Sequence, residues 1–267
     1  MEIYLAFYLG LGLVSGFIAG LLGVGGGLVM VPALVWAFSQ QGFSPDYTIH
    51  LALATSLAVI IPTALSSLRA HHQHGAVDWL TVRRIAPGIL LGTLLGGLAA
   101  AKLSDSSLRI FFTFFLFYAA TQMLLGFKPP AARSLPGMAG MTVVGGVIGL
   151  ISSWVGIGGG TMSVPFLTWC NVGLRRAIGT SSAIGLPIAI AGSIGYAISG
   201  LSVVSLPAAT FGFIYWPAML AVALGSGLTA PWGARATHRL PVQIIKKIFA
   251  GLLYLIAVRM AYGLWTD

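Results

Sequence analysis

Charged residues are scarce in this chain, and acidic residues are scarcer still. Only 7% of its 267 residues are Asp, Glu, Lys or Arg, whereas 57% are hydrophobic. A soluble globular domain carries about 25% charged residues, so this composition excludes one and is typical of an integral membrane protein. No stretch is polar enough to form a separate soluble domain. We therefore expect a single all-α domain embedded in the lipid bilayer.

Cysteine is nearly absent, and so are the motifs of soluble enzymes. Cys170 is the only cysteine, which excludes an intramolecular disulfide and a cysteine metal cluster. No glycine-rich loop ends in Gly-Lys-Ser or Gly-Lys-Thr, so the sequence contains no P-loop for a nucleotide. No paired acid and base or nucleophile constellation falls within an apolar segment. We therefore expect no enzymatic activity, no cofactor and no metal.

The histidines include one short cluster. His71, His72 and His74 lie between two apolar segments, with Asp78 as the nearest carboxylate. Without cysteine or further acidic ligands they make a weak metal site. We interpret them as solvated loop residues, with proton sensing as the alternative role.

Basic residues outnumber acidic ones and give the chain a net charge of +9. In a soluble protein this excess would suggest nucleic-acid binding. Here the Lys and Arg residues lie almost entirely in short loops between apolar runs, where they report membrane topology. We therefore expect the lipid bilayer, and no nucleic acid, as a partner.

Apolar runs separated by glycine, proline and charged residues predict five helical segments in each half of the chain. The first half, residues 1–126, has segments at about 3–22, 28–38, 48–69, 82–101 and 108–126. A proline-rich and basic linker at 127–136 precedes the second half, residues 137–267. Its segments lie at about 137–155, 161–171, 176–199, 208–234 and 241–263. We interpret the first segment as a retained helix rather than a cleaved signal peptide.

The two halves share several motifs. Residues 25–36 recur in register at 158–169, with three glycines, a Val-Pro pair, a Leu and a Trp at matching positions. Each half also has a Thr-Ser pair followed by a proline, and a glycine at the end of its last segment. These residues are Thr55, Ser56, Pro62 and Gly126 in the first half and Thr180, Ser181, Pro187 and Gly263 in the second. The chain is therefore a duplicated unit.

The positions of the basic residues indicate how the halves are oriented, because cytoplasmic loops collect Lys and Arg. We suppose that the first two segments of each half form a hairpin with the glycine loop at its tip. One side of the membrane then holds Lys102 and Arg109, and the other side holds Arg69, Arg83, Arg84, Lys128, Arg133, Arg175, Arg176, Arg235, Arg239, Lys246 and Lys247. If each hairpin is replaced by a single membrane crossing, the same basic residues divide more evenly between the two sides. We therefore predict two repeats of inverted topology, with both termini outside.

The glycine loops predict an anion site near the membrane midplane. A helix that begins just after three glycines leaves its first N–H groups unpaired and carries the positive end of the helix dipole. Two such helix starts, related by a two-fold axis in the membrane plane, would point converging N–H groups at one site. The expected substrate-binding residues are Gly25, Gly26, Gly27, Thr55, Ser56, Gly158, Gly159, Gly160, Thr161, Thr180 and Ser181. The alternatives are close helix packing for the glycines and hydrogen bonds to their own helices for the hydroxyls.

Interior prolines and the placement of the acidic residues indicate the mechanism. A proline removes a backbone hydrogen bond and loosens the helix around it. The expected hinges are Pro32, Pro62, Pro165 and Pro187. Cation carriers usually keep a carboxylate in the membrane, whereas every Asp and Glu here falls in an expected loop or terminus. We therefore expect an anionic substrate. Arg259 is the one basic residue inside a segment, near enough to its end to snorkel.

Two motifs carry a family resemblance. Gly-Val-Gly-Gly-Gly at 23–27 precedes Val31-Pro32, and Gly-Ile-Gly-Gly-Gly at 156–160 precedes Val164-Pro165. With Gly179-Thr180-Ser181, they resemble the sulfite exporter TauE/SafE family of membrane permeases over essentially the whole chain. The resemblance implies transport of a small sulfur-containing anion, such as sulfite, sulfoacetate or another organosulfonate, across the cytoplasmic (inner) membrane of a bacterium. Ala54 replaces the matching glycine in the first half, which alters local packing.

We therefore expect a secondary transporter, an exporter that exposes its anion alternately to each side of the membrane. A gradient must drive it, because no motif for ATP is present. A coupling proton and the membrane potential alone are both open, as is the oligomeric state. A passive anion channel and a non-transporting membrane subunit are the alternative functions.

Overall fold

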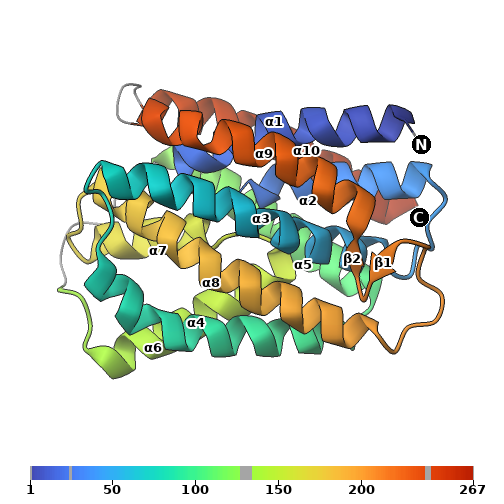
Figure 1. Cartoon of the computed structure of the whole chain (residues 1–267), viewed down its shortest axis with the longest axis horizontal. Helices are drawn as coiled ribbons and strands as arrows, with labels where there is room; N and C mark the ends of the chain where they lie inside the picture. The colour runs from blue at the N-terminus through green and yellow to red at the C-terminus, as the bar shows by residue number, and fades with distance from the viewer. Residues whose placement is uncertain (1, 24–25, 127–133, 238–241, 267) are drawn as a thin grey trace.

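The computed structural model describes residues 2–23, 26–126, 134–237 and 242–266 (Figure 1). Within these ranges the first half of the chain forms α1 (Glu2–Leu22), α2 (Gly27–Gln40), α3 (Thr48–Gln73), α4 (Trp79–Ala100) and α5 (Asp105–Leu125). The second half forms α6 (Met138–Val155), α7 (Gly160–Trp169), α8 (Leu174–Gly200), β1 (Thr210–Phe211), β2 (Ile214–Tyr215), α9 (Trp216–Thr237) and α10 (Val242–Thr266).

The fold class predicted from the sequence, an all-α membrane protein, is confirmed. Among the described helices, α1, α3, α4, α5, α6 and α8 are long and apolar enough to span a membrane. A helix satisfies its backbone hydrogen bonds internally, which lipid requires of any spanning segment. Polar side chains mark where helices begin: Asp78 accepts the N–H of Thr81 at the start of α4, and Ser104 accepts that of Ser107 at the start of α5.

The helix predicted at 208–234 is wrong in its first part. Residues there form the antiparallel pair β1 and β2, and α9 begins only at Trp216. Ala209 and Gly212 adopt φ angles of 65° and 55°. These left-handed conformations interrupt a helix, and they fold the chain into a turn before α9 starts.

Two other boundaries also differ from the prediction. Gly126 ends α5 in a left-handed conformation as predicted, but α10 continues through Gly263 to Thr266. The helix predicted to end at residue 69 extends to Gln73, so His71 lies in the last turn of α3. His71 is fully buried, and its Nε2 hydrogen-bonds to the carbonyl oxygen of Gly20 at 3.2 Å. The interpretation of His71 as a solvated loop residue is therefore wrong.

The two halves are interleaved. α1 of the first half packs along α9 of the second, and α4 of the first half packs along α6 of the second. Glycines permit both approaches, since a Cβ on Gly20 would lie 1.9 Å from the carbonyl oxygen of Ala230, and one on Gly88 would lie 1.8 Å from that of Thr142. α3 packs against α8, and α5 packs against α10. If each helix is replaced by its matching helix in the other half, the same helix pairs result.

The matching helices α3 and α8 run in opposite directions. In Figure 1, α3 runs from right to left and α8 from left to right. The two ends of the bundle differ in the residues that they carry. What we call the terminal end carries the start of α1 and the end of α10. What we call the basic end carries Arg69, Arg83, Arg84, Arg175, Arg176, Arg235, Lys246 and Lys247.

Candidate functional site

The two glycine loops occupy matching places in the fold. One joins α1 to the short helix α2, and the other joins α6 to the short helix α7. Gly26 and Gly159, which precede the short helices, have φ angles of 72° and 74°. Glycine adopts this left-handed conformation without steric cost. Within the described residues, neither glycine offers a side chain to cap the first N–H groups of its short helix, and uncapped N–H groups at a helix start can bind an anion.

The loops touch each other through their backbones. A Cβ on Gly27 would lie 2.1 Å from the carbonyl oxygen of Gly156, so only glycine fits there. The Ser56 hydroxyl donates to the same oxygen at 2.8 Å, and the Ser181 hydroxyl donates to the carbonyl oxygen of Gly23 at 3.2 Å. Gly23 and Gly156 are the matching first residues of the two loops. Each half thus contributes a serine that holds the loop of the other half.

The threonines of the Thr-Ser pairs bind backbone groups. The N–H of Tyr215 donates to Oγ1 of Thr55 at 3.1 Å, and the N–H of Asp78 donates to Oγ1 of Thr180 at 2.9 Å. Tyr215 and Asp78 directly precede α9 and α4, which are matching helices. The two threonines are fully buried and position the starts of these helices across the halves. A ligand-binding role for them stays a prediction.

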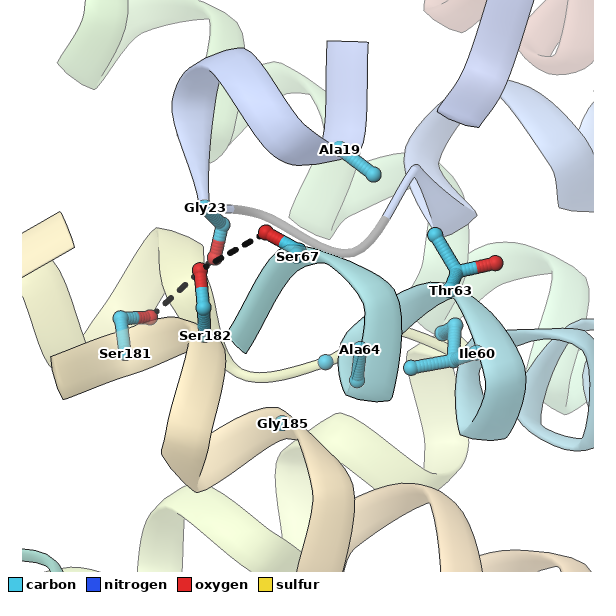
Figure 2. Close-up of a pocket in the computed structure, with 10 residues that line it drawn as sticks. Ala19, Gly23, Ile60, Thr63, Ala64, Ser67, Ser181, Ser182 and Gly185 are labelled. Atoms are coloured by element: carbon cyan, nitrogen blue, oxygen red, sulfur yellow. Dashed lines mark hydrogen bonds between the residues drawn. The ribbon is translucent and has the colours of Figure 1, made fainter. Parts of the chain in front are cut away.

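A small cavity lies beside the loops (Figure 2). It extends from the loops along α3 and α8 toward the basic end, and its lining residues are Ala19, Gly23, Ile60, Thr63, Ala64, Ser67, Gly158, Ser181, Ser182 and Gly185. Four of them carry hydroxyl groups, and Ser67 donates to the hydroxyl of Ser182 at 3.3 Å. The cavity volume is about 10 Å³, which is room for roughly one water molecule.

Two buried hydroxyls at the second loop have no hydrogen-bond partner within the described ranges. They are Oγ1 of Thr161, in the first turn of α7, and Oγ of Ser152, in the last turn of α6. Ser152 Oγ lies 3.4 Å from where a Cβ on Gly159 would stand. Buried polar groups are nearly always satisfied in native proteins. These two hydroxyls are therefore placed to bind a ligand or a water at the loop.

Sequence reasoning found part of this arrangement. It named Gly158, Ser181 and Thr161, but it missed Gly23 and the hydroxyl residues Thr63, Ser67, Ser152 and Ser182. The sequence gives only two hints to these missed residues: Thr63 directly follows the predicted hinge Pro62, and Ser182 directly follows Ser181. Gly25 lies outside the described residues.

The four predicted hinge prolines lie inside continuous helices: Pro32 in α2, Pro62 in α3, Pro165 in α7 and Pro187 in α8. A proline inside a helix cannot donate to the preceding turn, so the helix is weaker there. Pro62 and Pro187 lie near the middle of α3 and α8, the helices that line the cavity.

Charged side chains stay at the two ends of the bundle. Asp105 pairs with Arg109 at the terminal end, and Asp78 lies 3.7 Å from Arg176 at the basic end. Every acidic residue within the described ranges lies in a loop or in the first turn of a helix. The same ranges contain no group of three or more His, Cys, Asp or Glu residues that could hold a metal ion. The centre therefore offers neutral donors, which are backbone N–H groups and hydroxyls.

The chain is similar to a family of membrane proteins and to relatives named as membrane transporters. Residues 8–260 match the family model described as sulfite exporter TauE/SafE. A "Probable membrane transporter protein" of Haemophilus influenzae is 38% identical, covering 93% of this chain and 95% of that protein. "Probable membrane transporter protein YunE" of Bacillus subtilis is 26% identical, covering 94% of this chain and 95% of that protein. No solved structure matches the chain.

Proposed function

The chain belongs to the sulfite exporter TauE/SafE family, and on that premise we propose that it is a secondary carrier of a small sulfur-containing anion. The candidate substrates are sulfite, sulfoacetate and other organosulfonates. The chain is a multi-pass membrane protein, and its family points to transport rather than to enzymatic chemistry.

The backbone contact between the two glycine loops is the observation that carries this proposal. The start of α2 meets the beginning of the second glycine loop where Gly27 contacts Gly156, beside hydroxyls from α3 and α8. Helix N-termini and hydroxyls stabilise an anion through their N–H and O–H dipoles. Such neutral donors bind an anion less tightly than a buried arginine would, which allows release. The expected binding groups are the first N–H groups of α2 and α7, with Ser181, Thr161 and the cavity hydroxyls.

Inverted topology is the second part of the proposal. It is supported by the opposite directions of α3 and α8, and by the reciprocal hydrogen bonds of Ser56 and Ser181. We place the basic end in the cytoplasm and both termini outside, because cytoplasmic loops collect Lys and Arg. The membrane is then the cytoplasmic (inner) membrane of a bacterium.

The small size of the cavity supports alternating access. A cavity of about 10 Å³ admits roughly one water molecule, so a larger sulfur oxyanion needs α3 and α8 to move apart. Their interior prolines, Pro62 and Pro187, are the proposed hinges. This conformation then corresponds to a closed state between the inward-open and outward-open states. A permanently open channel would need a wider path.

Export is the favoured direction because the two sides of the loops differ. When the Thr-Ser pairs of the halves are matched, three cavity hydroxyl residues align with apolar or smaller residues on the opposite side. The hydroxyl residues are Thr63, Ser67 and Ser182, and their counterparts are Ile188, Gly192 and Leu57. Hydroxyls hydrate the route from the basic end, and the arginines there raise the local concentration of anions. This favours loading from the cytoplasm.

The test is the flux of isotope-labelled sulfite and sulfoacetate through purified protein in proteoliposomes. A carrier gives saturable flux, whereas a channel gives flux that rises steadily with concentration and carries a measurable current. Ser182→Ala should reduce the flux severalfold, and Ser202→Ala, an exposed position at the terminal end, should leave it unchanged. Absence of flux for every sulfur anion tested would overturn the proposed function.

A further inference from the structure

A second and larger cavity opens at the terminal end of the bundle, away from the glycine loops. We call it the α2 crevice, because one face of α2 forms much of its wall, together with residues of α1, α5 and α10. Its volume is about 670 Å³, which lies within the range of ~300–1,000 Å³ typical of small-molecule sites. It is therefore large enough to hold part of a lipid molecule.

Helix α2 itself separates the α2 crevice from the small cavity beside the glycine loops. The face of α2 that lines the crevice carries Val29, Pro32, Ala33 and Trp36, which are partly or well exposed. The opposite face of α2, including Leu34, is fully buried in the core. The crevice is thus on the lipid-facing side of the helix, and no residue lines both cavities.

Two arginines line the crevice from different helices. Arg109 extends from the first turns of α5 and pairs with Asp105. Arg259 extends from α10, is exposed, and has no hydrogen-bond or ion-pair partner within the described ranges. A cation on an apolar helix near the membrane surface is costly in lipid unless it meets an anion or water. Among the described residues, the site therefore has one guanidinium neutralised by a carboxylate and a second guanidinium without one.

The remaining walls are apolar. Besides the α2 residues, they include Phe7 of α1 and Ile256 and Met260 of α10. Trp36 is 40% exposed, and its ring lies 5.3 Å from that of Phe7. An amphipathic tryptophan near a helix end is typical of the headgroup level of a membrane. The crevice thus combines a cationic part near the membrane surface with an apolar part that runs along α2 toward the bilayer centre.

We propose that the α2 crevice binds an anionic phospholipid of the leaflet at the terminal end, which is the outer leaflet in the orientation proposed above. The phosphate of the headgroup meets the guanidiniums of Arg259 and Arg109, and an acyl chain lies along Val29, Pro32 and Ala33. Arginine recognises phosphate through paired, charge-assisted hydrogen bonds. A free inorganic anion would leave the apolar walls unfilled, so the lipid fits both parts of the crevice. The proposal does not depend on the identity of the transported anion.

The experiment is native mass spectrometry of the purified protein with dioleoyl phosphatidylglycerol or dioleoyl phosphatidylcholine added in equal amounts. The wild type should retain one phosphatidylglycerol molecule in preference to phosphatidylcholine. Arg259→Gln should lower that preference about tenfold. The matched control is Lys102→Gln, which removes one positive charge at the same end but outside the crevice, and it should leave the preference unchanged. All variants are compared as monodisperse protein with wild-type thermal stability.

Three results would overturn the inference. Equal retention of both lipids by the wild type would remove the anionic headgroup as the ligand. Equal loss of preference in Arg259→Gln and Lys102→Gln would mean that the effect is general charge rather than the crevice. Displacement of phosphatidylglycerol by millimolar inorganic phosphate would assign the site to a free anion instead of a lipid. A failure of sulfite flux would bear on the proposed function and would leave this test unaffected.

Discussion

Substitution of Gly27 by alanine tests the contact between the glycine loops. The added Cβ would stand 2.1 Å from the carbonyl oxygen of Gly156, whereas real Cβ contacts essentially never fall under 3.0 Å, so the backbones must separate by 0.9 Å or more. The next obstacles are Ile157 Cγ2 at 2.9 Å and the carbonyl carbon of Gly156 at 3.0 Å. Two of these three atoms belong to the backbone, so no side-chain rotation relieves the clash.

The expected cost has two parts. Overpacking of a tight contact destabilises a protein by about 1–3 kcal/mol, which should lower the thermal unfolding temperature in detergent. The displacement also moves the first N–H groups of α2 relative to the second glycine loop. Since misplacement of binding groups by about 1 Å can cost up to about a hundredfold in rate, we expect sulfite flux per folded molecule to fall by at least about tenfold.

Gly10→Ala is the control for this substitution. Gly10 lies in α1 of the same hairpin, and a Cβ there meets nothing within 4 Å. Alanine favours a helix over glycine by up to about 1 kcal/mol, so stability should be unchanged or slightly higher, with normal flux. Wild-type stability and flux in Gly27→Ala would refute the contact between the loops. Reduced stability with normal flux per folded molecule would refute its place in the transport path.

The remaining predictions concern the reciprocal serines and the topology. Ser56→Ala and Ser181→Ala each leave a buried carbonyl oxygen without its hydroxyl donor, so each should lower stability by about 1–3 kcal/mol, measured by thermal or denaturant unfolding in detergent; a loss in only one of them would contradict their equivalence. In a Cys170→Ser background, a membrane-impermeant maleimide added to intact cells should label Ser106→Cys, in the first turn of α5 at the terminal end. The same reagent should label His72→Cys at the basic end only after the membrane is permeabilised, and the reverse pattern would contradict the proposed orientation.

Local features of this fold could be predicted from the sequence because they depend on neighbouring residues. Apolar length predicts spanning helices, and three consecutive glycines before a Val-Pro pair predict a loop followed by a short helix. The boundaries failed where local geometry overrides hydropathy. Residues 208–215 are apolar enough for a helix, but the turn at Ala209 and Gly212 directs them into two strands.

Features that depend on helix pairing could not be predicted in this way. The packing of α1 on α9 and of α4 on α6 brings together residues far apart in the chain. Glycine spacing indicated that close contacts exist, but it carries no information about the partner helix. For the same reason, the hydrogen bonds of Ser56 to Gly156 and of Ser181 to Gly23 were not foreseen. Thr63 and Ser67 line the cavity because α3 lies beside the glycine loop, and the sequence does not report that placement.

The roles of two polar residues, His71 and Arg259, depend on the helices packed beside them. His71 sits in an apparently polar stretch of three histidines, yet α3 extends one further turn and buries it against Gly20. Arg259 was interpreted as a residue that reaches the membrane surface, and the structure adds that it faces the α2 crevice together with Arg109. In both cases the helix packed beside the residue sets its environment. The hydropathy of the residue's own segment carries no information about that neighbour.

The central claim is that the anion passes between the two glycine loops. The most direct measurement compares labelled sulfite flux in proteoliposomes containing wild-type protein with flux in the Gly26→Leu, Gly159→Leu double variant. Both positions have left-handed backbones with φ of 72° and 74°, so the variant must first be shown to be monodisperse and helical. The account predicts saturable flux in the wild type and none in the folded variant. Equal saturable flux in both would contradict it.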